Sequence, residues 1–271
     1  MNRESPLGRR VAGSTRYDPG LLFPIERSEG RARLGLGEGS LPFAGTDVWH
    51  AYELSWLEAG GRPRVAVGRI EVPAASPRMV ESKSLKLYLN ALNGSTFDDA
   101  AAVRDTIARD LGEATGGTVS VTLAGLEDPA FHGIAAPGAC IDEAPLAGPA
   151  AAPDRELLRA DAGEPVEETL HSHLLRSLCP VTAQPDWATV VISYRGPRLD
   201  RGALLAYLVA FREHQDFHEQ CVERIFLDLA AVLSPQTLAV QALYTRRGGL
   251  DISPWRSSTP GRAPQYRLHR Q

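Results

Sequence analysis

Alternating apolar and polar residues predict β-strands in both halves of the chain. In each half, two strands come first, separated by turn residues, and a third follows a helical region. In the first half the predicted strands cover residues 51–57, 65–72 and 118–123. In the second half they cover residues 169–178, 188–194 and 238–245.

Between the second and third strand of each half, apolar residues recur at helical spacing in two successive blocks. Tyr88 returns as Tyr207 and Asp110 as Asp228, at offsets of 119 and 118 residues. Two amphipathic helix pairs share much of this pattern by chance, but the preserved spacing favours a duplication. Each half then predicts an antiparallel sheet with both helices on one face, which is an α+β fold.

A segment rich in Ala, Pro and Gly separates the two halves. We therefore predict an N-terminal lobe over residues 1–127, a linker or surface excursion over 128–165, and a C-terminal lobe over 166–271. The first fifty residues lack clear periodicity. We expect them to form an extended segment around the first lobe.

The composition narrows the function classes. The 271 residues are 43% apolar and 23% charged, as in globular proteins, and a net charge of −4 gives no reason to expect nucleic-acid or membrane binding. The longest apolar run, residues 203–211, is too short to span a bilayer, and the N-terminus does not resemble a secretory signal. Three cysteines fit a reducing compartment, so we expect a cytoplasmic protein.

The strongest chemical signal lies around Cys179, seven residues before Asp186. Two prolines lie between them, so the segment reads as a stiff turn that joins two strands. Such a hairpin brings a soft nucleophile close to a proton donor, which suits addition to an electrophilic carbon. The alternative is an inert buried cysteine beside a surface aspartate.

His218 and Glu219 start the second helix of the later pair, where both reach one ligand only near the helix end. A glutamate there accepts two N–H bonds from a guanine-like edge, and the histidine bonds a carbonyl or steers a proton. A capping glutamate beside a surface histidine is an equal alternative. The first half has Asp98 and Asp99 as the sequence counterparts.

The cysteines and histidines also raise the question of a metal. His214 and His218 stand four residues apart, and Cys179 offers a third ligand, but the residues between the histidines resemble a helix break. Zinc is therefore a minority hypothesis. Cys140 has no partner pattern, and Cys221 falls on an apolar helix face, where a core position is expected.

Two further motifs suit an anion. Ser82 or Ser84 is positioned to cap a helix that carries Lys83 nearby, and Arg247-Gly248 lies in a glycine turn after a strand. Each motif is also typical of an ordinary capped helix or a charged hairpin turn. The glycine-rich residues 35–40 lack the third glycine and a preceding strand, so no Rossmann unit is predicted.

One chain combines the motifs YELSWL at 52–57, ESKSLK at 81–86, QPDW at 184–187, FHEQCVER at 217–224 and RRGGLD at 246–251. Together these resemble the NADPH-dependent 7-cyano-7-deazaguanine reductases (QueF) of queuosine biosynthesis, in their long two-lobed form. The resemblance extends over nearly the whole chain and is poorest in the linker. It implies two tandem tunnelling-fold units with the active site between them.

The resemblance also implies an activity, the reduction of a nitrile to a primary amine with two NADPH. It implies that Cys179 is the nucleophile that forms a thioimide and that Asp186 donates a proton. Substrate binding is implied for Val80, Glu81, Ser82, His218 and Glu219, and NADPH binding for Ser82, Lys83, Arg247 and Gly248. No metal is expected.

Two other classes of function stay open. The first is a zinc-dependent cyclohydrolase or pterin synthase of the same fold, with Cys179, His214 and His218 as ligands. The second is a purine- or pterin-binding protein without catalysis, which would need Glu219 but no thiol in its pocket. For partners we expect a small 7-deazapurine substrate, no nucleic acid and no membrane. Open sheet edges predict a homodimer.

Overall fold

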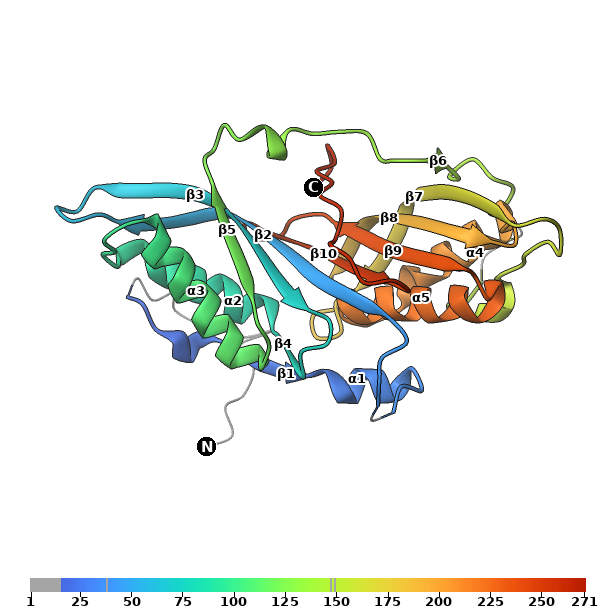
Figure 1. Cartoon of the computed structure of the whole chain (residues 1–271), viewed down its shortest axis with the longest axis horizontal. Coiled ribbons are helices and arrows are strands. Elements are labelled where there is room, and N and C mark those ends of the chain that lie inside the picture. The colour runs from blue at the N-terminus through green and yellow to red at the C-terminus, as the bar shows by residue number, and fades with distance from the viewer. Residues whose placement is uncertain (1–15, 38, 147, 149) are drawn as a thin grey trace. The chain divides into compact units, whose positions relative to one another are not determined.

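A computed structural model describes residues 16–37, 39–146, 148 and 150–271 (Figure 1). The chain divides into two compact units. Unit 1 holds the residues up to Gly39 together with Asp47–His132 and Arg246–Asp251. Unit 2 holds Ser40–Thr46, Gly133–Thr245 and Ile252–Gln271.

Unit 1 contains a sheet with the strand order β5-β3-β2. Its strands are β2 (Ala44–Leu57, whose first residues belong to unit 2), β3 (Pro63–Pro73) and β5 (Ser120–Ala124). β3 and β5 are antiparallel, with Ile70 opposite Val121. The helices are α1 (Arg27–Arg33), α2 (Ser82–Ala91) and α3 (Ala100–Thr115), and a small ribbon pairs β1 (Pro24–Glu26) with β4 (Arg78–Val80).

Unit 2 contains a sheet with the strand order β10-β9-β8-β7-β6. The strands are β6 (Ala139–Cys140), β7 (Val166–Leu178), β8 (Pro185–Gly196), β9 (Thr237–Tyr244) and β10 (Leu250–Ser257, which begins in unit 1). Helices α4 (Arg201–Val209) and α5 (His218–Leu233) lie on one face of this sheet (Figure 1). Short 3-10 helices complete the chain at Pro19–Leu21, Leu92–Gly94, Pro129–Phe131, Arg155–Leu157 and Ala210–Glu213.

The long helices follow directly from their apolar spacing. In α5 the side chains of Val222, Ile225, Phe226 and Leu229 are buried at intervals of three and four residues, which places them on one helix face. The helix ends where Ser234 takes a left-handed conformation with φ of 41°. Replacing Phe226 with alanine would therefore leave a cavity and cost about 3–5 kcal/mol.

Both units use one tyrosine–aspartate hydrogen bond to join their two helices. The hydroxyl of Tyr88 in α2 donates to Asp110 in α3 at 2.7 Å, and that of Tyr207 in α4 donates to Asp228 in α5 at 2.6 Å. The α3 and α5 helices are both 16 residues long. The same bond at corresponding places supports the predicted duplication.

The predicted α+β class is confirmed, with antiparallel strand pairs in both units and a helix pair on one face of each sheet. All the predicted strands and both helix pairs are present. One difference is β6, which comes from the predicted linker and pairs with β7 in parallel. The division into lobes at 127 and 166 stays a prediction. In the two compact units, Ser40–Thr46 belongs to unit 2 and Arg246–Asp251 to unit 1, so neither unit is one continuous stretch of chain.

The sequence pattern does not predict β10, because the residues of this strand are buried on both faces and include charged side chains. Arg256 is fully buried, and its guanidinium binds the carboxylate of Glu223 in α5 at 2.9 Å. This pairing satisfies both charges, which local sequence patterns do not reveal. In the described part of the chain, no helix has the length and apolar character needed to cross a membrane.

Candidate active site

The predicted stiff turn joins β7 to β8. The amide of Cys179 donates to the carbonyl of Gln184 at 2.9 Å, and the amide of Ala183 donates to the carbonyl of Cys179 at 3.0 Å. Ala183 has a φ of 52°, a strained value for a residue with a side chain. The backbone of this turn is therefore tightly constrained.

The strand register relates the position of Cys179 to that of Asp186. Asp186 lies opposite Ser177, and Cys179 follows Ser177 by two residues. Cys179 lies one residue beyond the end of β7, and its amide bond to Gln184 continues the pairing of the two strands. Side chains two apart point to the same side of a strand, so we expect Cys179 to lie diagonal to Asp186. That the thiol and the acid act together stays a prediction.

The burial of these two residues does not fit the alternative of an inert cysteine beside a surface aspartate. Asp186 is only 5% exposed, whereas Cys179 is partly exposed. The acid is the enclosed member of the pair and the thiol is the accessible one. This arrangement suits a nucleophile that meets a ligand entering from solvent and an acid that is shielded from water.

Backbone hydrogen bonds bring the start of α5 to this turn. The amide of Leu178 donates to the carbonyl of His214 at 2.9 Å, and the amide of Asp216 donates to the carbonyl of Leu178 at 3.2 Å. The end of β7 is therefore fixed to the segment that leads into α5. His218, the first residue of that helix, is placed beside the hairpin as a result.

His218 is held between a carboxylate and an aromatic ring. Its Nε2 atom lies 3.2 Å from Oδ2 of Asp186. Its ring stacks on Tyr244 of β9, with 3.8 Å between the ring centroids and an interplanar angle of 22°. Burial, followed by the neighbouring Cys221 thiol, raises the pKa of Tyr244 well above its usual value, so its ring presents a neutral surface to the imidazole.

Glu219 is buried in the first turn of α5, at 4% exposure. The N-cap position belongs to Phe217, whose side chain makes no capping hydrogen bond. A carboxylate at a helix N-terminus is stabilised by the helix dipole. The burial of much of His218 does not fit a surface histidine, whereas the role of Glu219 in recognition stays a prediction.

The three cysteines differ sharply in their surroundings. Cys221 is fully buried, and burial, followed by the charge of Asp216, raises the pKa of its thiol. Because the thiolate is the reactive form, Cys221 is chemically inert and its predicted core position is confirmed. Cys140 is exposed and belongs to a different part of unit 2. Cys179 is partly exposed and lies in the turn of the hairpin that contains Asp186.

A second group of predicted site residues lies in unit 1, at the start of α2. Glu81 is the N-cap, and its carboxylate accepts the amides of Lys83 at 2.6 Å and Ser84 at 2.8 Å. The prediction that Ser82 or Ser84 caps this helix is therefore wrong. Those amides already bind a carboxylate, which is an anion held by the chain itself. Val80 ends β4 and is buried.

The glycine turn with Arg247 and Gly248 lies against α2 in the same unit. The amide of Arg247 donates to the carbonyl of Leu250 at 2.8 Å, and Gly248 has a φ of 57°. A Cβ atom on Gly248 would lie 3.2 Å from Cδ of Lys86, so glycine permits this close approach. The structure therefore brings the turn and α2 together within unit 1.

The predicted site residues fall into two groups, one in each unit. Cys179, Asp186, His218 and Glu219 belong to unit 2, whereas Val80, Glu81, Ser82, Lys83, Arg247 and Gly248 belong to unit 1. Among the described residues, Cys179, His214 and His218 do not form a metal-binding group. His214 ends a 3-10 helix before α5, so the two histidines do not share a helix face. The geometry thus gives the zinc alternative no support.

Sequence reasoning missed the aromatic support of His218. Tyr244 ends the predicted strand over residues 238–245, and its stacking on His218 depends on a contact between a strand and a helix. Sequence reasoning also missed a group of Cys140, His171 and His173 on the β6 side of unit 2. The spacing of two histidines by two residues along a predicted strand was a usable signal for it.

Comparison with known proteins gives two family matches. The family described as "Nitrile reductase, 7-cyano-7-deazaguanine-reductase N-term" matches residues 14–123, and the family described as "QueF-like protein" matches residues 185–262. A solved structure titled as the apo form of archaeosine synthase QueF-Like is 17% identical. It covers 37% of this chain and 100% of its own, with a TM-score of 0.29.

Several curated proteins are similar over almost their whole length. A protein of Chromohalobacter salexigens is 56% identical over 98% of this chain and 96% of its own. One from Stenotrophomonas maltophilia strain K279a is 53% identical over 99% and 97%, and one from Azoarcus sp. strain BH72 is 56% identical over 94% and 90%. Each of these relatives is named NADPH-dependent 7-cyano-7-deazaguanine reductase.

Proposed function

The chain belongs to the family of NADPH-dependent 7-cyano-7-deazaguanine reductases, and from this premise we propose how its residues carry the reaction. It is an oxidoreductase that reduces the nitrile of 7-cyano-7-deazaguanine to the primary amine, a step in queuosine biosynthesis. NADPH supplies one hydride in each of two reductions. The observation that carries the proposal is the contact of His218 with Asp186 at 3.2 Å, on the β7–β8 hairpin whose turn contains Cys179.

In the proposed mechanism Cys179 loses its thiol proton to solvent, and the thiolate sulfur forms a bond to the nitrile carbon. The nitrogen gains the electron pair of the broken π bond and takes a proton from Asp186, which gives a thioimide. A nitrile is a poor hydride acceptor, and this addition converts it into a C=N group that is easier to reduce. After the first reduction the carbon–sulfur bond breaks and the thiolate leaves. The imine that remains needs no protein nucleophile.

His218 and Glu219 position the substrate in this proposal. The contact with Asp186 and the stacking on Tyr244 fix the imidazole of His218, so its direction is set before a ligand binds. The buried carboxylate of Glu219 accepts the ring N–H and amino group of the deazaguanine. Val80, Glu81 and Ser82 contribute further substrate contacts.

We assign NADPH binding to Ser82, Lys83, Arg247 and Gly248. Lys83 and Arg247 offer cationic side chains of the kind that bind phosphate, and the Gly248 turn lies beside α2 in the same unit. These residues fit a dinucleotide with phosphate groups and provide no metal site.

The proposal also covers the lobes, the oligomeric state and the location of the protein. We propose two tandem tunnelling-fold lobes over 1–127 and 166–271, with a linker over 128–165, and a homodimer. All three cysteines are free and the net charge is −4, which supports a cytoplasmic protein that binds neither nucleic acid nor membranes.

The experiment mixes the protein with 7-cyano-7-deazaguanine and follows NADPH oxidation by absorbance and product formation by mass spectrometry. The expected result is two NADPH oxidised for each amine formed. Lys83→Ala should raise KM for NADPH about tenfold or more, since a charge-assisted phosphate bond is lost. Arg104→Ala, which removes an exposed arginine of the same unit, is the matched control. An unchanged KM in Lys83→Ala would contradict the assigned cofactor site.

A further inference from the structure

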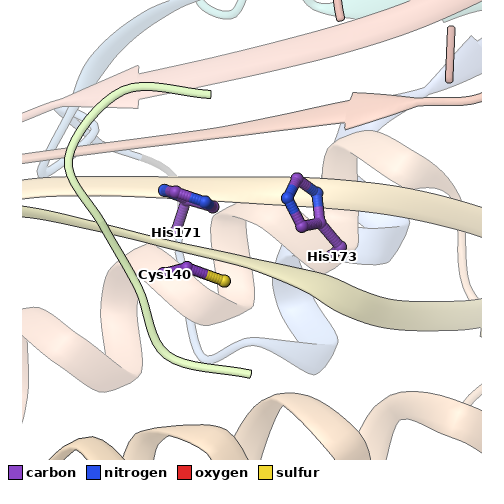
Figure 2. A group of neighbouring side chains, drawn as sticks. All are labelled: Cys140, His171 and His173. Atoms are coloured by element: carbon purple, nitrogen blue, oxygen red, sulfur yellow. The ribbon is translucent and has the colours of Figure 1, made fainter. Parts of the chain in front are cut away.

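Three potential metal ligands meet in unit 2, outside the proposed active-site residues. These are Cys140 of β6 and His171 and His173 of β7 (Figure 2). One ligand atom from each residue lies within 4.8 Å of the others. A thiol and two imidazoles are a ligand set that suits Zn²⁺.

The backbone explains why these side chains meet. His171 and His173 are two residues apart on β7, a spacing that places side chains on one side of a strand. β6 pairs with β7 in parallel, with Cys140 directly beside His171, and the amide of Ile141 donates to the carbonyl of His171 at 3.0 Å. The thiol is thus brought to the histidines by a segment more than twenty residues away in sequence.

The hydrogen bonds of the histidines leave one ring nitrogen of each for a ligand. Nδ1 of His171 lies 2.8 Å from the carbonyl oxygen of Pro137, which only accepts, so this nitrogen carries the proton. Nε2 of His171 then bears a lone pair. Nδ1 of His173 lies 2.8 Å from the hydroxyl of Thr189, which can donate or accept, so this contact occupies Nδ1 and leaves Nε2 for a ligand. Metal-binding histidines use their second nitrogen in this manner.

The neighbouring charges are compatible with a bound cation. The carboxylate of Asp142 accepts the hydroxyl of Ser172 at 2.6 Å and the amide of His173 at 3.1 Å, so one negative charge is fixed nearby. The guanidinium of Arg270 donates to the carbonyl of His173 at 3.1 Å.

We propose that Cys140, His171 and His173 bind a Zn²⁺ ion with water in the fourth position. Ligand atoms of a tetrahedral site with bonds of about 2.0–2.3 Å lie about 3.3–3.8 Å apart, so the three side chains need to close by no more than about 1.5 Å on binding. Cys140 is exposed and has room to make this movement. Binding replaces the thiol proton with the metal and releases it to solvent.

The metal fixes the segment that contains β6 to the edge of the unit 2 sheet. β6 is only two residues long, and few backbone bonds hold it to β7. A metal bond between Cys140 and the two histidines adds a link that such a short strand lacks. The site is separate from the proposed thioimide chemistry and does not depend on it.

The test uses the full chain, freed of metal with a chelator and then dialysed with Zn²⁺ alone. We expect one tightly held Zn²⁺ per chain by elemental analysis. Co²⁺ as a spectroscopic probe should show the absorption of a tetrahedral thiolate complex. Cys140→Ala should lose both signals, and His171→Ala should weaken Zn²⁺ binding about tenfold or more.

Two controls keep the outcome clear. Cys179→Ala removes a different thiol and should bind Zn²⁺ as the unmodified chain does. Cys140→Ala should keep its circular dichroism spectrum and its NADPH-dependent turnover, which separates this proposal from the reductase assignment. Failure of the unmodified chain to retain Zn²⁺, or equal retention by Cys140→Ala, would overturn the proposed site.

Discussion

The two units carry equivalent helix pairs that differ at the start of the longer helix. In unit 1, Asp99 is the N-cap of α3, and its carboxylate accepts the amide of Ala102 at 2.8 Å. In unit 2, Phe217 takes the corresponding position and gives no such bond, and α5 begins with His218 and Glu219. The start of α3 is thus an ordinary capped helix end. The start of α5 instead places two ionisable side chains near the turn between β7 and β8, which contains Cys179.

The helix positions also correct the sequence comparison. Counted from the first residue of each 16-residue helix, His218 and Glu219 correspond to Ala100 and Ala101 rather than to Asp98 and Asp99. Ala100 and Ala101 are exposed, whereas Glu219 is buried. The two units thus share the helix framework and differ in the first helical turn, which begins with two alanines in α3 and with His218 and Glu219 in α5.

The largest expected effect comes from removing the Cys179 thiol of unit 2, which has no counterpart in unit 1. Cys179→Ala should lower turnover about a thousandfold or more. Without the thiol no covalent intermediate forms, and the other catalytic residues cannot replace that step. Steady-state NADPH oxidation measures this. Cys140→Ala should keep normal turnover as the control, and substantial activity in Cys179→Ala would remove the thiol from the mechanism.

The next effect concerns the acid beside His218. Asp186→Asn keeps the shape of the side chain but offers no acidic proton, so turnover should fall roughly a hundredfold. Substrate affinity should change much less, and a titration of the variant measures it separately. Near-normal turnover would show that Asp186 serves only the hairpin.

The third prediction compares the first turn of α5 with the first turn of α3. Glu219→Leu should weaken binding of the deazaguanine by about 2–4 kcal/mol, because two buried N–H donors of the substrate lose their acceptor. Ala101→Leu places the same side chain at the same position of α3 and should leave affinity unchanged. Calorimetric titration of both variants gives the comparison, and equal affinities would exclude Glu219 from recognition.

The shared helix framework should respond unequally to loss of its tyrosine hydroxyl. Tyr207→Phe removes the hydrogen bond at 2.6 Å from Asp228, whose ion-pair contact with Arg224 is longer at 3.8 Å, and should cost about 1.5–3 kcal/mol in free energy of unfolding. Tyr88→Phe leaves Asp110 with the hydroxyl of Tyr17 at 2.7 Å, and should cost about 0.5–1.5 kcal/mol. Urea unfolding measures both, and a larger loss in Tyr88→Phe would contradict this reasoning.

The smallest effect is a dependence on alkaline pH. Burial, followed by the adjacent carboxylate, raises the pKa of Tyr88 and of Tyr207 above the usual value of 10.0. Stability from these groups is complete below that value and falls as pH rises above it, because the unfolded chain then releases protons that the folded chain retains. Unfolding at a series of pH values should show this loss, and Tyr207→Phe should reduce its slope.

Much of the framework follows from the sequence because it depends on local periodicity. The alternation over 169–178 and 188–194 predicts β7 and β8, and the prolines between them predict the thiol turn, which the register confirms. The helix pairs follow from apolar spacing in the same way. Local pattern is therefore enough to place Cys179 and Asp186 on one hairpin.

Other features depend on contacts between distant segments, which periodicity does not encode. Arg256 of β10 is charged but buried, because Glu223 of α5 pairs with it. A charged residue in this position hides the apolar pattern by which a strand is recognised in the sequence. Cys140 reaches His171 through the two-residue β6, too short to leave a pattern. The cap of α2 is a glutamate rather than the expected serine, since the Glu81 carboxylate reaches two amides at once.

The measurement that tests the central claim most directly is the intact mass of the protein after incubation with 7-cyano-7-deazaguanine in the absence of NADPH. The account predicts an adduct of one substrate mass, located by peptide mapping at Cys179, and no adduct on Cys179→Ala. An adduct that persists in Cys179→Ala, or an unmodified protein that turns over substrate without ever forming one, would contradict it.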